Sequence, residues 1–178
     1  MKYVHYYDSP LGRMTATSDG TALTGLWFDD TEHYPHLLPE GGEEQKTQEC
    51  AGNILPVFEE TDRWLDLYFA GEIPVFMPPI AMVGSDFQKE VWSILLTIPY
   101  GGTTSYGEIA RKIAEQRGIK RMAAQAVGGA VGRNPICIIV PCHRVIGTDR
   151  SLTGYGGGMD RKIWLLNHEG ITDYISTK

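Results

Sequence analysis

Short runs of alternating apolar and polar residues occupy the start of the chain. They lie at residues 3–7, 13–17 and 22–28. Ser9-Pro10-Leu11-Gly12 separates the first two runs and Asp19-Gly20 separates the last two, and both segments are rich in turn-forming residues. The pattern predicts an antiparallel meander of three strands.

Apolar residues at helical spacing dominate the chain from residue 54 onward. They predict a first helix over residues 54–70, followed by a proline-rich linker over residues 72–82. Beyond the linker the spacing predicts helices at residues 85–98, 106–115, 121–131 and 160–169. The second and third of these, joined by a short basic loop, form a helix-turn-helix candidate. The small residues of helix 121–131 allow close approach either to a protein core or to a nucleic-acid groove.

A run of aliphatic residues at 136–140 predicts a short buried strand that ends at Pro141. Cys142 and His143 follow at once, so the thiol would stand at the end of a rigid segment. This position favours a nucleophile, but it equally favours a small buried apolar residue, which is the commonest role of a cysteine outside a disulfide. These elements predict an α/β chain of two domains, residues 1–80 with a sheet and a helix and residues 81–178 mainly helical.

Composition narrows the class of protein. The chain has 178 residues, of which 42% are hydrophobic, as is usual for a globular protein. It contains no apolar run long enough to span a membrane and no basic-then-apolar leader, so we expect a cytoplasmic protein without a membrane partner. Three cysteines, Cys50, Cys137 and Cys142, are an odd number without a CxxC pair, as expected in a reducing compartment.

Charge is unevenly distributed along the chain. The net charge is −6, yet residues 1–80 hold 4 basic and 14 acidic residues, whereas residues 81–178 hold 12 and 8. Eight basic residues fall between positions 105 and 150: Arg111, Lys112, Arg117, Lys120, Arg121, Arg133, Arg144 and Arg150. They are candidates for phosphate contact or simply form a solvated face. His33, His36 and Cys50, in an acidic loop predicted over residues 29–52, are a weak metal signal that we interpret as ordinary surface residues.

Several motifs stand together in one order along the second half. They are Tyr106-Gly107-Glu108, Ala126-Val127-Gly128-Gly129, Asn134-Pro135, Pro141-Cys142-His143-Arg144-Val145, Gly154-Tyr155, Trp164-Leu165-Leu166 and Glu169-Gly170. In this order and spacing the chain resembles the O6-alkylguanine-DNA alkyltransferases, the methylated-DNA–protein-cysteine methyltransferases. The resemblance is strong over residues 85–172 and looser over the first 80 residues. It implies a ribonuclease-H-like α/β N-terminal domain that supports a C-terminal domain for DNA binding and alkyl transfer.

The resemblance also implies a reaction. Cys142 would accept the alkyl group of O6-alkylguanine, and of O4-alkylthymine, irreversibly and once per chain. His143 would take the thiol proton through a water molecule, Glu169 would orient the imidazole, and Asn134 would brace the thiolate region. Tyr106 would protonate or hydrogen-bond the guanine at N3. No cofactor and no metal are implied.

The same resemblance implies the substrate and DNA contacts. The partner would be double-stranded DNA containing O6-alkylguanine, bound by a monomer that flips the damaged nucleotide out of the helix. The base pocket would be lined by Val145, Tyr155, Gly156 and Gly157. The recognition helix would enter the minor groove, and the DNA-binding residues would be Arg121, Ala123, Gln125, Ala126, Gly128 and Arg133.

Five features depart from the family pattern or select among its members. Gln125 stands where many members have an arginine, and Gly156 where serine or alanine is usual. Cys137 is an extra thiol that we expect to be inert. The cysteines that bind structural zinc in some members are absent, and the presence of Cys142 excludes the members that bind DNA without transfer.

Two other classes of function remain open from the residues. A helix-turn-helix regulator would use Cys142 only to sense damage or oxidants, and its DNA binding would survive Cys142→Ala. A thiol hydrolase would use the Cys-His pair with turnover on small esters, although no oxyanion motif is present.

Overall fold

The computed structural model describes residues 2–31 and 54–175. The predicted loop from residue 32 onward, with His33, His36 and Cys50, lies outside the described residues. The chain divides into two compact units, Met1–Val83 and Gly84–Lys178. The break falls one residue after the end of the predicted linker.

The first unit contains the antiparallel meander that the sequence predicts. Strands β1 (Tyr3–Ser9), β2 (Gly12–Ser18) and β3 (Leu23–Phe28) pair in the order β1-β2-β3. Ser9 and Gly12 are directly paired, so Pro10 and Leu11 form a two-residue hairpin. At the second turn, the Asp19 carboxylate accepts hydrogen bonds from the backbone of Thr21 (2.8 Å) and Ala22 (2.9 Å).

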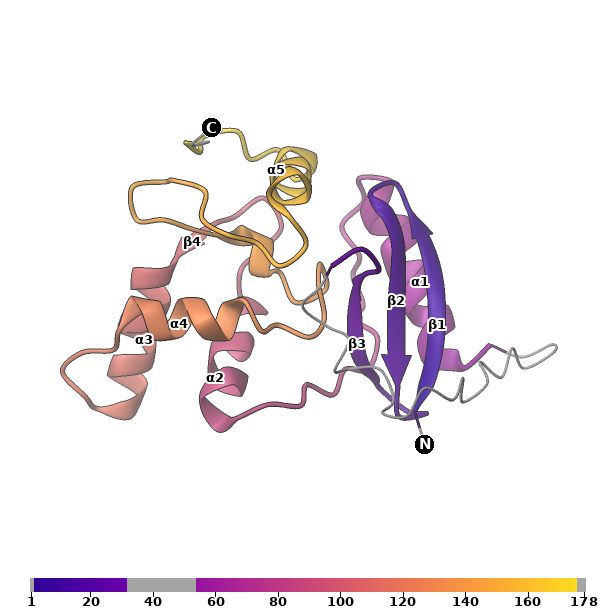
Figure 1. Ribbon diagram of the computed structural model, residues 1–178, viewed down its shortest axis with the longest axis horizontal. Helices are drawn as coiled ribbons and strands as arrows, with labels where there is room; N and C mark the ends of the chain where they lie inside the picture. The colour runs from indigo at the N-terminus through magenta and orange to yellow at the C-terminus, as the bar shows by residue number, and fades with distance from the viewer. Residues whose placement is uncertain (1, 32–53, 176–178) are drawn as a thin grey trace. The chain divides into compact units, whose positions relative to one another are not determined.

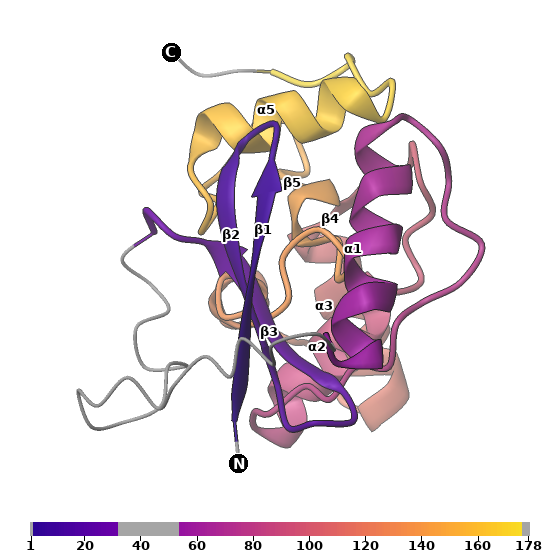
Figure 2. The ribbon, with the colours of Figure 1, turned by 90° about the vertical axis from the view of Figure 1, so that its right-hand side faces the viewer.

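Helix α1 (Pro56–Phe69) packs against β1 and β3. Figure 1 shows the three strands side by side with α1 along one face, and Figure 2 shows the helix axis running roughly along the strands. The buried stripe of the helix consists of Val57, Phe58, Thr61, Trp64, Leu65 and Tyr68. Gly71, at φ +83°, ends the helix as predicted, because a left-handed residue there lets the backbone N–H of Glu72 reach Leu67 O (3.0 Å).

The second unit is mainly helical. It contains α2 (Asp86–Leu95), α3 (Tyr106–Arg117), α4 (Ala124–Val131) and α5 (Met159–His168), with two short parallel strands, β4 (Thr104–Ser105) and β5 (Val145–Ile146). Helices α2, α3 and α4 pack on one another, and β4 lies between them and α5 (Figure 1). The Trp92 indole, 1% exposed, donates to Ala130 O (2.9 Å) and ties α2 to α4.

The helix-turn-helix candidate is present with shifted bounds. Helix α3 extends to Arg117 and ends at Gly118, which adopts φ +65°. Helix α4 begins at Ala124 rather than at residue 121, because the backbone of Ala123 is still extended (φ −75°, ψ 125°). The helix starts there without a side-chain cap.

The predicted strand at residues 136–140 is wrong. This segment is a series of turns, in which Ile138 adopts a left-handed φ of +67°. Its backbone groups bond within the segment, since Ile139 N donates to Cys137 O (2.8 Å) and Val140 N donates to Ile136 O (3.1 Å). The segment is buried throughout, so the apolar run correctly indicated burial but not conformation.

Two capping boxes fix the starts of α2 and α3, and their loss should be measurable. Ser85→Ala and Ser105→Ala are each expected to lower the free energy of unfolding of the helical unit by about 1 kcal/mol, because each removes the acceptor for an N-terminal backbone N–H. Urea denaturation followed by circular dichroism measures this. Ser93→Ala is the matched control, because Ser93 Oγ bonds Lys89 O inside α2 (2.8 Å) and caps no helix. An equal loss in all three variants would contradict the assignment.

Candidate active site

Asn134 organises the turn that carries Cys142. Its side-chain oxygen accepts from Ile136 N (3.0 Å), and its amide nitrogen lies 3.2 Å from Ile136 O and 2.8 Å from Val140 O. The same nitrogen lies 3.1 Å from Cys142 Sγ. Because Asn134 is fully buried, these contacts are not exchanged with water. The Asn134 side chain therefore fixes both the turn and the sulfur.

The environment of Cys142 favours the thiolate. The residue begins a single 3₁₀ turn, Cys142–Arg144, and is 6% exposed. The pKa of its thiol lies below the ordinary value: a hydrogen bond with the Cys137 side chain lowers it most, burial opposes this, and Asn134 and the Lys162 charge lower it further. A thiol in such surroundings is a stronger candidate for a nucleophile than for a plain core residue.

His143 and Glu169 are in direct contact. His143 Nε2 lies 2.7 Å from Glu169 Oε1, and neither side chain has exposed surface. Burial lowers the pKa of His143 below its ordinary value, against the opposing effect of Glu169. A neutral ring whose Nε2 hydrogen points at the carboxylate keeps its lone pair on Nδ1. Nδ1 is buried and has no hydrogen-bond partner among residues 2–31 and 54–175, so this atom is available to accept a proton.

Arg144 is the second partner of the Glu169 carboxylate. Its Nε donates to Oε2 (2.8 Å) and its Nη2 to Oε1 (2.9 Å), a bidentate pair, while Nη1 donates to Ile98 O (2.7 Å). Burial alone raises the pKa of Glu169, but the hydrogen bonds and charges of His143 and Arg144 lower it to about 2. Glu169 is therefore ionised at neutral pH although it is buried.

The loop before β4 holds the end of α5. Glu169 follows the last residue of α5, and its Oε2 also accepts from Gly101 N (3.3 Å). Gly101 adopts φ +74°, and a Cβ there would lie 3.3 Å from Glu169 O. Tyr100 OH donates to His168 O (3.1 Å). The carboxylate at the end of the helix is thus held by two other segments of the chain, the turn that carries His143 and Arg144 and the loop that carries Gly101.

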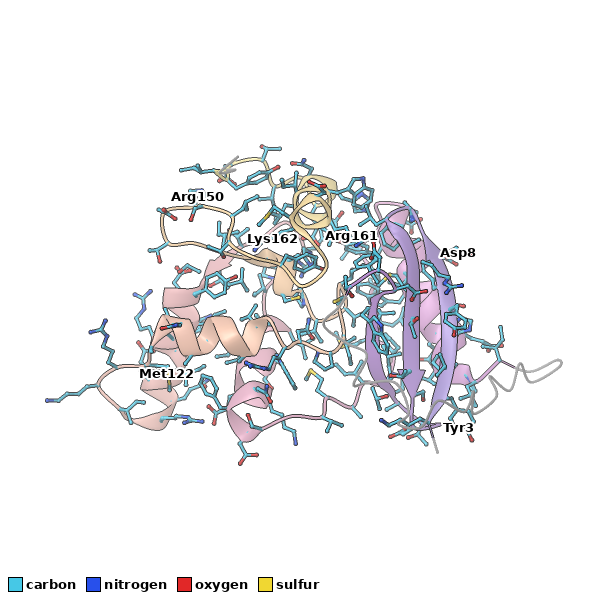
Figure 3. All side chains as sticks on the ribbon, viewed as in Figure 1. Tyr3, Asp8, Met122, Arg150, Arg161 and Lys162 are labelled. Carbon is cyan, nitrogen blue, oxygen red and sulfur yellow. The ribbon has the colours of Figure 1, made fainter. Side chains whose placement is uncertain are left out.

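Lys162 is a buried cation on α5. Its side chain, labelled in Figure 3, extends from the helix to donate to Val145 O (2.7 Å) and Thr153 O (3.1 Å). Burial lowers the pKa of Lys162 to about 8, and the charge of Cys142 opposes that shift. Lys162 joins the strand after Cys142 to the loop that follows it and places positive charge near the sulfur.

Tyr106 is the first residue of α3, directly after the capping residue Ser105. Thr153 Oγ1 donates to Tyr106 OH (3.0 Å), which leaves the phenolic hydrogen available to another acceptor. Burial raises the pKa of Tyr106 above its ordinary value, so the phenol keeps its proton at neutral pH. A Cβ on Gly128 would lie 3.7 Å from the Tyr106 ring, so α4 passes beside the ring.

The pocket residues implied by the resemblance lie between β5 and α5. Val145 begins β5, and Tyr155, Gly156 and Gly157 form the turn before α5, where Gly158 N donates to Tyr155 O (3.0 Å). Thr153, two residues before Tyr155, donates to Tyr106 OH through its side chain and accepts from Lys162 Nζ at its carbonyl. The structure therefore brings the segment that carries Tyr155 into contact with groups that also surround Cys142.

The residues implied to bind DNA lie on or beside α4. Exposed side chains there belong to Arg121, Ala123, Gln125, Ala126 and Arg133, with Gly128 partly buried. The opposite face of the helix packs inward through Val127, Ala130 and Val131. Helix α4 therefore presents a face of small and polar residues on a rigid support.

Only some of the eight basic residues between positions 105 and 150 are both exposed and free of an ion pair to another described residue. Arg144 is buried against Glu169, Arg117 pairs with Glu90 (2.9 Å), and Arg150 pairs with Asp173. Figure 3 labels Met122 in the loop before α4 and Arg150 in the loop after β5. Of the eight basic residues in this cluster, the exposed ones without an ion pair to another described residue are Arg111, Lys112, Lys120, Arg121 and Arg133. Arg133 also donates to Gly129 O (3.2 Å).

The described residues contain neither a metal-binding cluster nor a membrane-spanning helix. No group of three or more His, Cys, Asp and Glu side chains within residues 2–31 and 54–175 is arranged to hold a metal ion. Over the same residues, the helices fall short of the length and apolar character needed to cross a membrane.

Comparison with protein-family models identifies both units. Residues 86–171 match the DNA-binding domain of 6-O-methylguanine DNA methyltransferase, and residues 2–80 match the ribonuclease-like domain of the same family. The chain belongs to the 6-O-methylguanine DNA methyltransferase family. This confirms the resemblance and the two-domain α/β fold class.

Individual relatives agree over nearly the whole chain. It is 45% identical over 165 residues to a methylated-DNA–protein-cysteine methyltransferase of Mycobacterium leprae, covering 91% of this chain and 88% of that protein. It is 51% identical over 167 residues to the protein of that name from Methanosarcina barkeri, covering 92% and 96%. Its structure resembles the crystal structure of Mycobacterium tuberculosis OGT in complex with DNA, with a TM-score of 0.73 and 44% identity over 94% and 92% of the chains.

The sequence did not predict that three residues, Arg144, Lys162 and Cys137, lie next to Cys142 or Glu169. The sequence places Arg144 among the candidates for phosphate contact or a solvated face, gives no signal for Lys162, and predicts an inert Cys137. For Arg144 the signal available was its place inside the Pro141–Val145 motif. Lys162 and Cys137 carry no local signal, because their roles depend on contacts that only the folded chain brings together.

The ionised Glu169 should contribute stability that depends on pH. Its ordinary pKa of 4.5 applies to the unfolded chain and the value of about 2 to the folded one, so the folded state binds this proton less readily. The contribution is fully present above about pH 4.5 and is lost as the pH falls toward 2. The free energy of unfolding of Glu169→Gln should therefore change less across this window than that of the wild type, as measured by urea denaturation at stepped pH. Parallel curves for the two proteins would refute this role.

Proposed function

We propose that the protein repairs O6-alkylguanine in double-stranded DNA, and O4-alkylthymine, by moving the alkyl group irreversibly onto Cys142. The observation that carries the proposal is the arrangement of a thiolate-favouring Cys142 next to a His143 whose ring is held by the ionised Glu169. The sulfur attacks the alkyl carbon, the carbon–oxygen bond breaks, and the thioether stays on the protein. No cofactor takes part, because the protein itself is the acceptor.

In this proposal His143 removes the thiol proton through a water molecule. The supporting geometry is the contact from Nε2 to Glu169, which leaves the lone pair on Nδ1. Glu169 stabilises the imidazolium that forms, and Arg144 keeps Glu169 ionised and fixed. Asn134 donates to the sulfur and stabilises the thiolate.

The guanine leaves with negative charge, and Tyr106 and the pocket residues would meet it. Tyr106 would donate its phenolic hydrogen to N3, and a backbone N–H near Gly156 would point at O6. The carbonyl groups of Cys142 and Val145 would accept from the exocyclic amine, and Tyr155 would form a wall of the pocket. The contact from Thr153 supports the orientation of Tyr106 that this requires.

The damaged nucleotide would reach Cys142 by leaving the base stack. Helix α4 would lie in the minor groove, where Ala123, Ala126 and Gly128 permit close approach to the DNA. Gln125 would fill the gap left by the flipped base without adding charge, and Arg121 and Arg133 would contact phosphates. Their exposure on or beside a rigid helix supports this assignment.

The proposal extends to the organisation of the chain. Residues 81–178 would perform DNA binding and alkyl transfer, and residues 1–80 would support them. The protein would act as a monomer in the cytoplasm, where reducing conditions keep Cys142 as a thiol.

Alkyl uptake by intact protein tests the proposal directly. On incubation with O6-benzylguanine, each chain should gain one benzyl group in place of the thiol hydrogen, read by intact-protein mass spectrometry and assigned to Cys142 by peptide mapping. With methylated duplex DNA the gain should be one methylene. Cys142→Ala should take up neither group. Catalytic turnover, or a label on another residue, would refute the proposal.

Removing the Tyr106 hydroxyl should slow transfer without changing its stoichiometry. Tyr106→Phe is expected to lower the rate of benzyl uptake about 100-fold, because a hydrogen-bond donor to the leaving guanine is lost. A single-turnover time course measures the rate. Tyr7→Phe is the matched control, because it removes a tyrosine hydroxyl that bonds Asp66 in the first unit (2.8 Å). Equal rates for the two variants would show that Tyr106 has no such role.

A further inference from the structure

A second thiol lies beside the proposed alkyl acceptor and is not itself alkylated in the proposed reaction. Cys137 is 1% exposed and Cys142 is 6% exposed, and both are thiols in the structure. Their side chains are hydrogen-bonded to each other. Two sulfur atoms in contact in a buried site differ chemically from a lone cysteine, because one can react with an oxidised form of the other.

The turn between the two cysteines brings them together. Ile138 at φ +67° reverses the chain immediately after Cys137, and this conformation is strained for a β-branched residue. Two further bonds close the turn, from Ile139 N to Cys137 O (2.8 Å) and from Cys142 N to Val140 O (2.8 Å). Asn134 bonds both ends of the segment, at Ile136 and at Cys142 Sγ. The pairing of the thiols is therefore a product of the fold at this point.

The surroundings make Cys142 the more easily oxidised of the two sulfurs. The hydrogen bond with Cys137, the Asn134 amide and the Lys162 ammonium favour its thiolate, and thiolates are the form that peroxides attack. Cys142 also retains some exposed surface, whereas Cys137 has almost none. A small oxidant would therefore react at Cys142 first, with Cys137 as the neighbouring thiol.

We propose that Cys137 and Cys142 form an oxidation site, at which a hydroperoxide converts the two thiols into a disulfide that blocks alkyl transfer reversibly. The inference rests on the proposed function only for its effect on activity. The disulfide itself follows from the contact between the two thiols.

The chemistry balances with the peroxide as the oxidant. With hydrogen peroxide, the Cys142 thiolate attacks one oxygen, the O–O bond breaks, and Cys142 becomes a sulfenic acid while the released hydroxide takes up a proton to form water; an alkyl hydroperoxide releases the corresponding alcohol instead. The Cys137 sulfur then attacks the Cys142 sulfur, the S–O bond breaks, and a second water leaves with the Cys137 proton. Bond formation brings the sulfurs to about 2.05 Å, which requires rotation of both side chains. A dithiol reductant restores both thiols by exchange.

The disulfide would protect the acceptor as well as block it. A sulfenic acid without a neighbouring thiol proceeds to the sulfinic acid, which dithiols do not reduce. Because each chain accepts only one alkyl group, a chain oxidised to the disulfide can still be reduced and used, whereas a chain oxidised to the sulfinic acid cannot.

Peptide mass spectrometry on the full-length protein tests the inference. Trypsin cleavage after Arg133 and Arg144 releases one peptide, residues 134–144, that contains both cysteines and excludes Cys50. After hydrogen peroxide, this peptide should lose two hydrogens, benzyl uptake should be abolished, and dithiothreitol should restore both. A peptide that only gains oxygen, or a link from Cys142 to Cys50, would overturn the inference.

Cys137→Ser is the matched variant, because its hydroxyl keeps a donor beside Cys142 but cannot form the disulfide. Each protein is compared with its own untreated sample. After peroxide treatment long enough to produce sulfinic acid, the wild type should recover about tenfold more benzyl uptake on reduction than Cys137→Ser. Equal recovery would overturn the inference. A disulfide that forms in a protein whose untreated form takes up no benzyl group would refute the proposed function and leave the oxidation site standing.

Discussion

A carboxylate without exposed surface needs hydrogen-bond donors on every side, and Glu169, at the end of α5, obtains them from two other segments of the chain. The Arg144 guanidinium contacts both of its oxygens, His143 contacts one, and Gly101 N contacts the other. Each contact places a segment: the 3₁₀ turn that carries Cys142, the loop before β4, and the end of α5. Because a buried charge tolerates no missing partner, this carboxylate holds the three segments together and orients the imidazole at the same time.

Asn134 does for the sulfur what Glu169 does for the imidazole. Its side-chain amide bonds the backbone of Ile136 and Val140, groups that would pair with a neighbouring strand if the segment were part of a sheet. The segment can therefore form turns instead of a strand. Cys142 Sγ then lies next to the Asn134 side-chain amide and not at the end of a strand. The nucleophile is therefore placed by a polar side chain inside an apolar run.

The elements that could be predicted from the sequence are those fixed by nearby residues. The hairpin at Pro10-Leu11, the Asp19 turn and the boxes at Ser85 and Ser105 each depend on contacts within four residues. The segment 136–140 could not be predicted, since its length and composition fit a strand and the competing Asn134 bonds leave no periodic pattern. The motif residues His143 and Glu169 were found through the family resemblance, and their contact over 26 positions had no local signal. Arg144 and Lys162 look like surface cations in the sequence because nothing local shows that their charged ends are buried.

Lys162 is a buried charge in a unit whose interior is mostly apolar. Its folded pKa of about 8 lies below the ordinary 10.5, so the folded state releases this proton more readily than the unfolded chain does. The charged form therefore costs stability below pH 8, on the order of 3 kcal/mol, and the cost falls away as the pH rises from 8 toward 10.5. A methionine could fill similar space without that cost. The ammonium instead donates to Val145 O and Thr153 O and favours the Cys142 thiolate. The buried lysine therefore lowers the stability of the core and raises the reactivity of the sulfur.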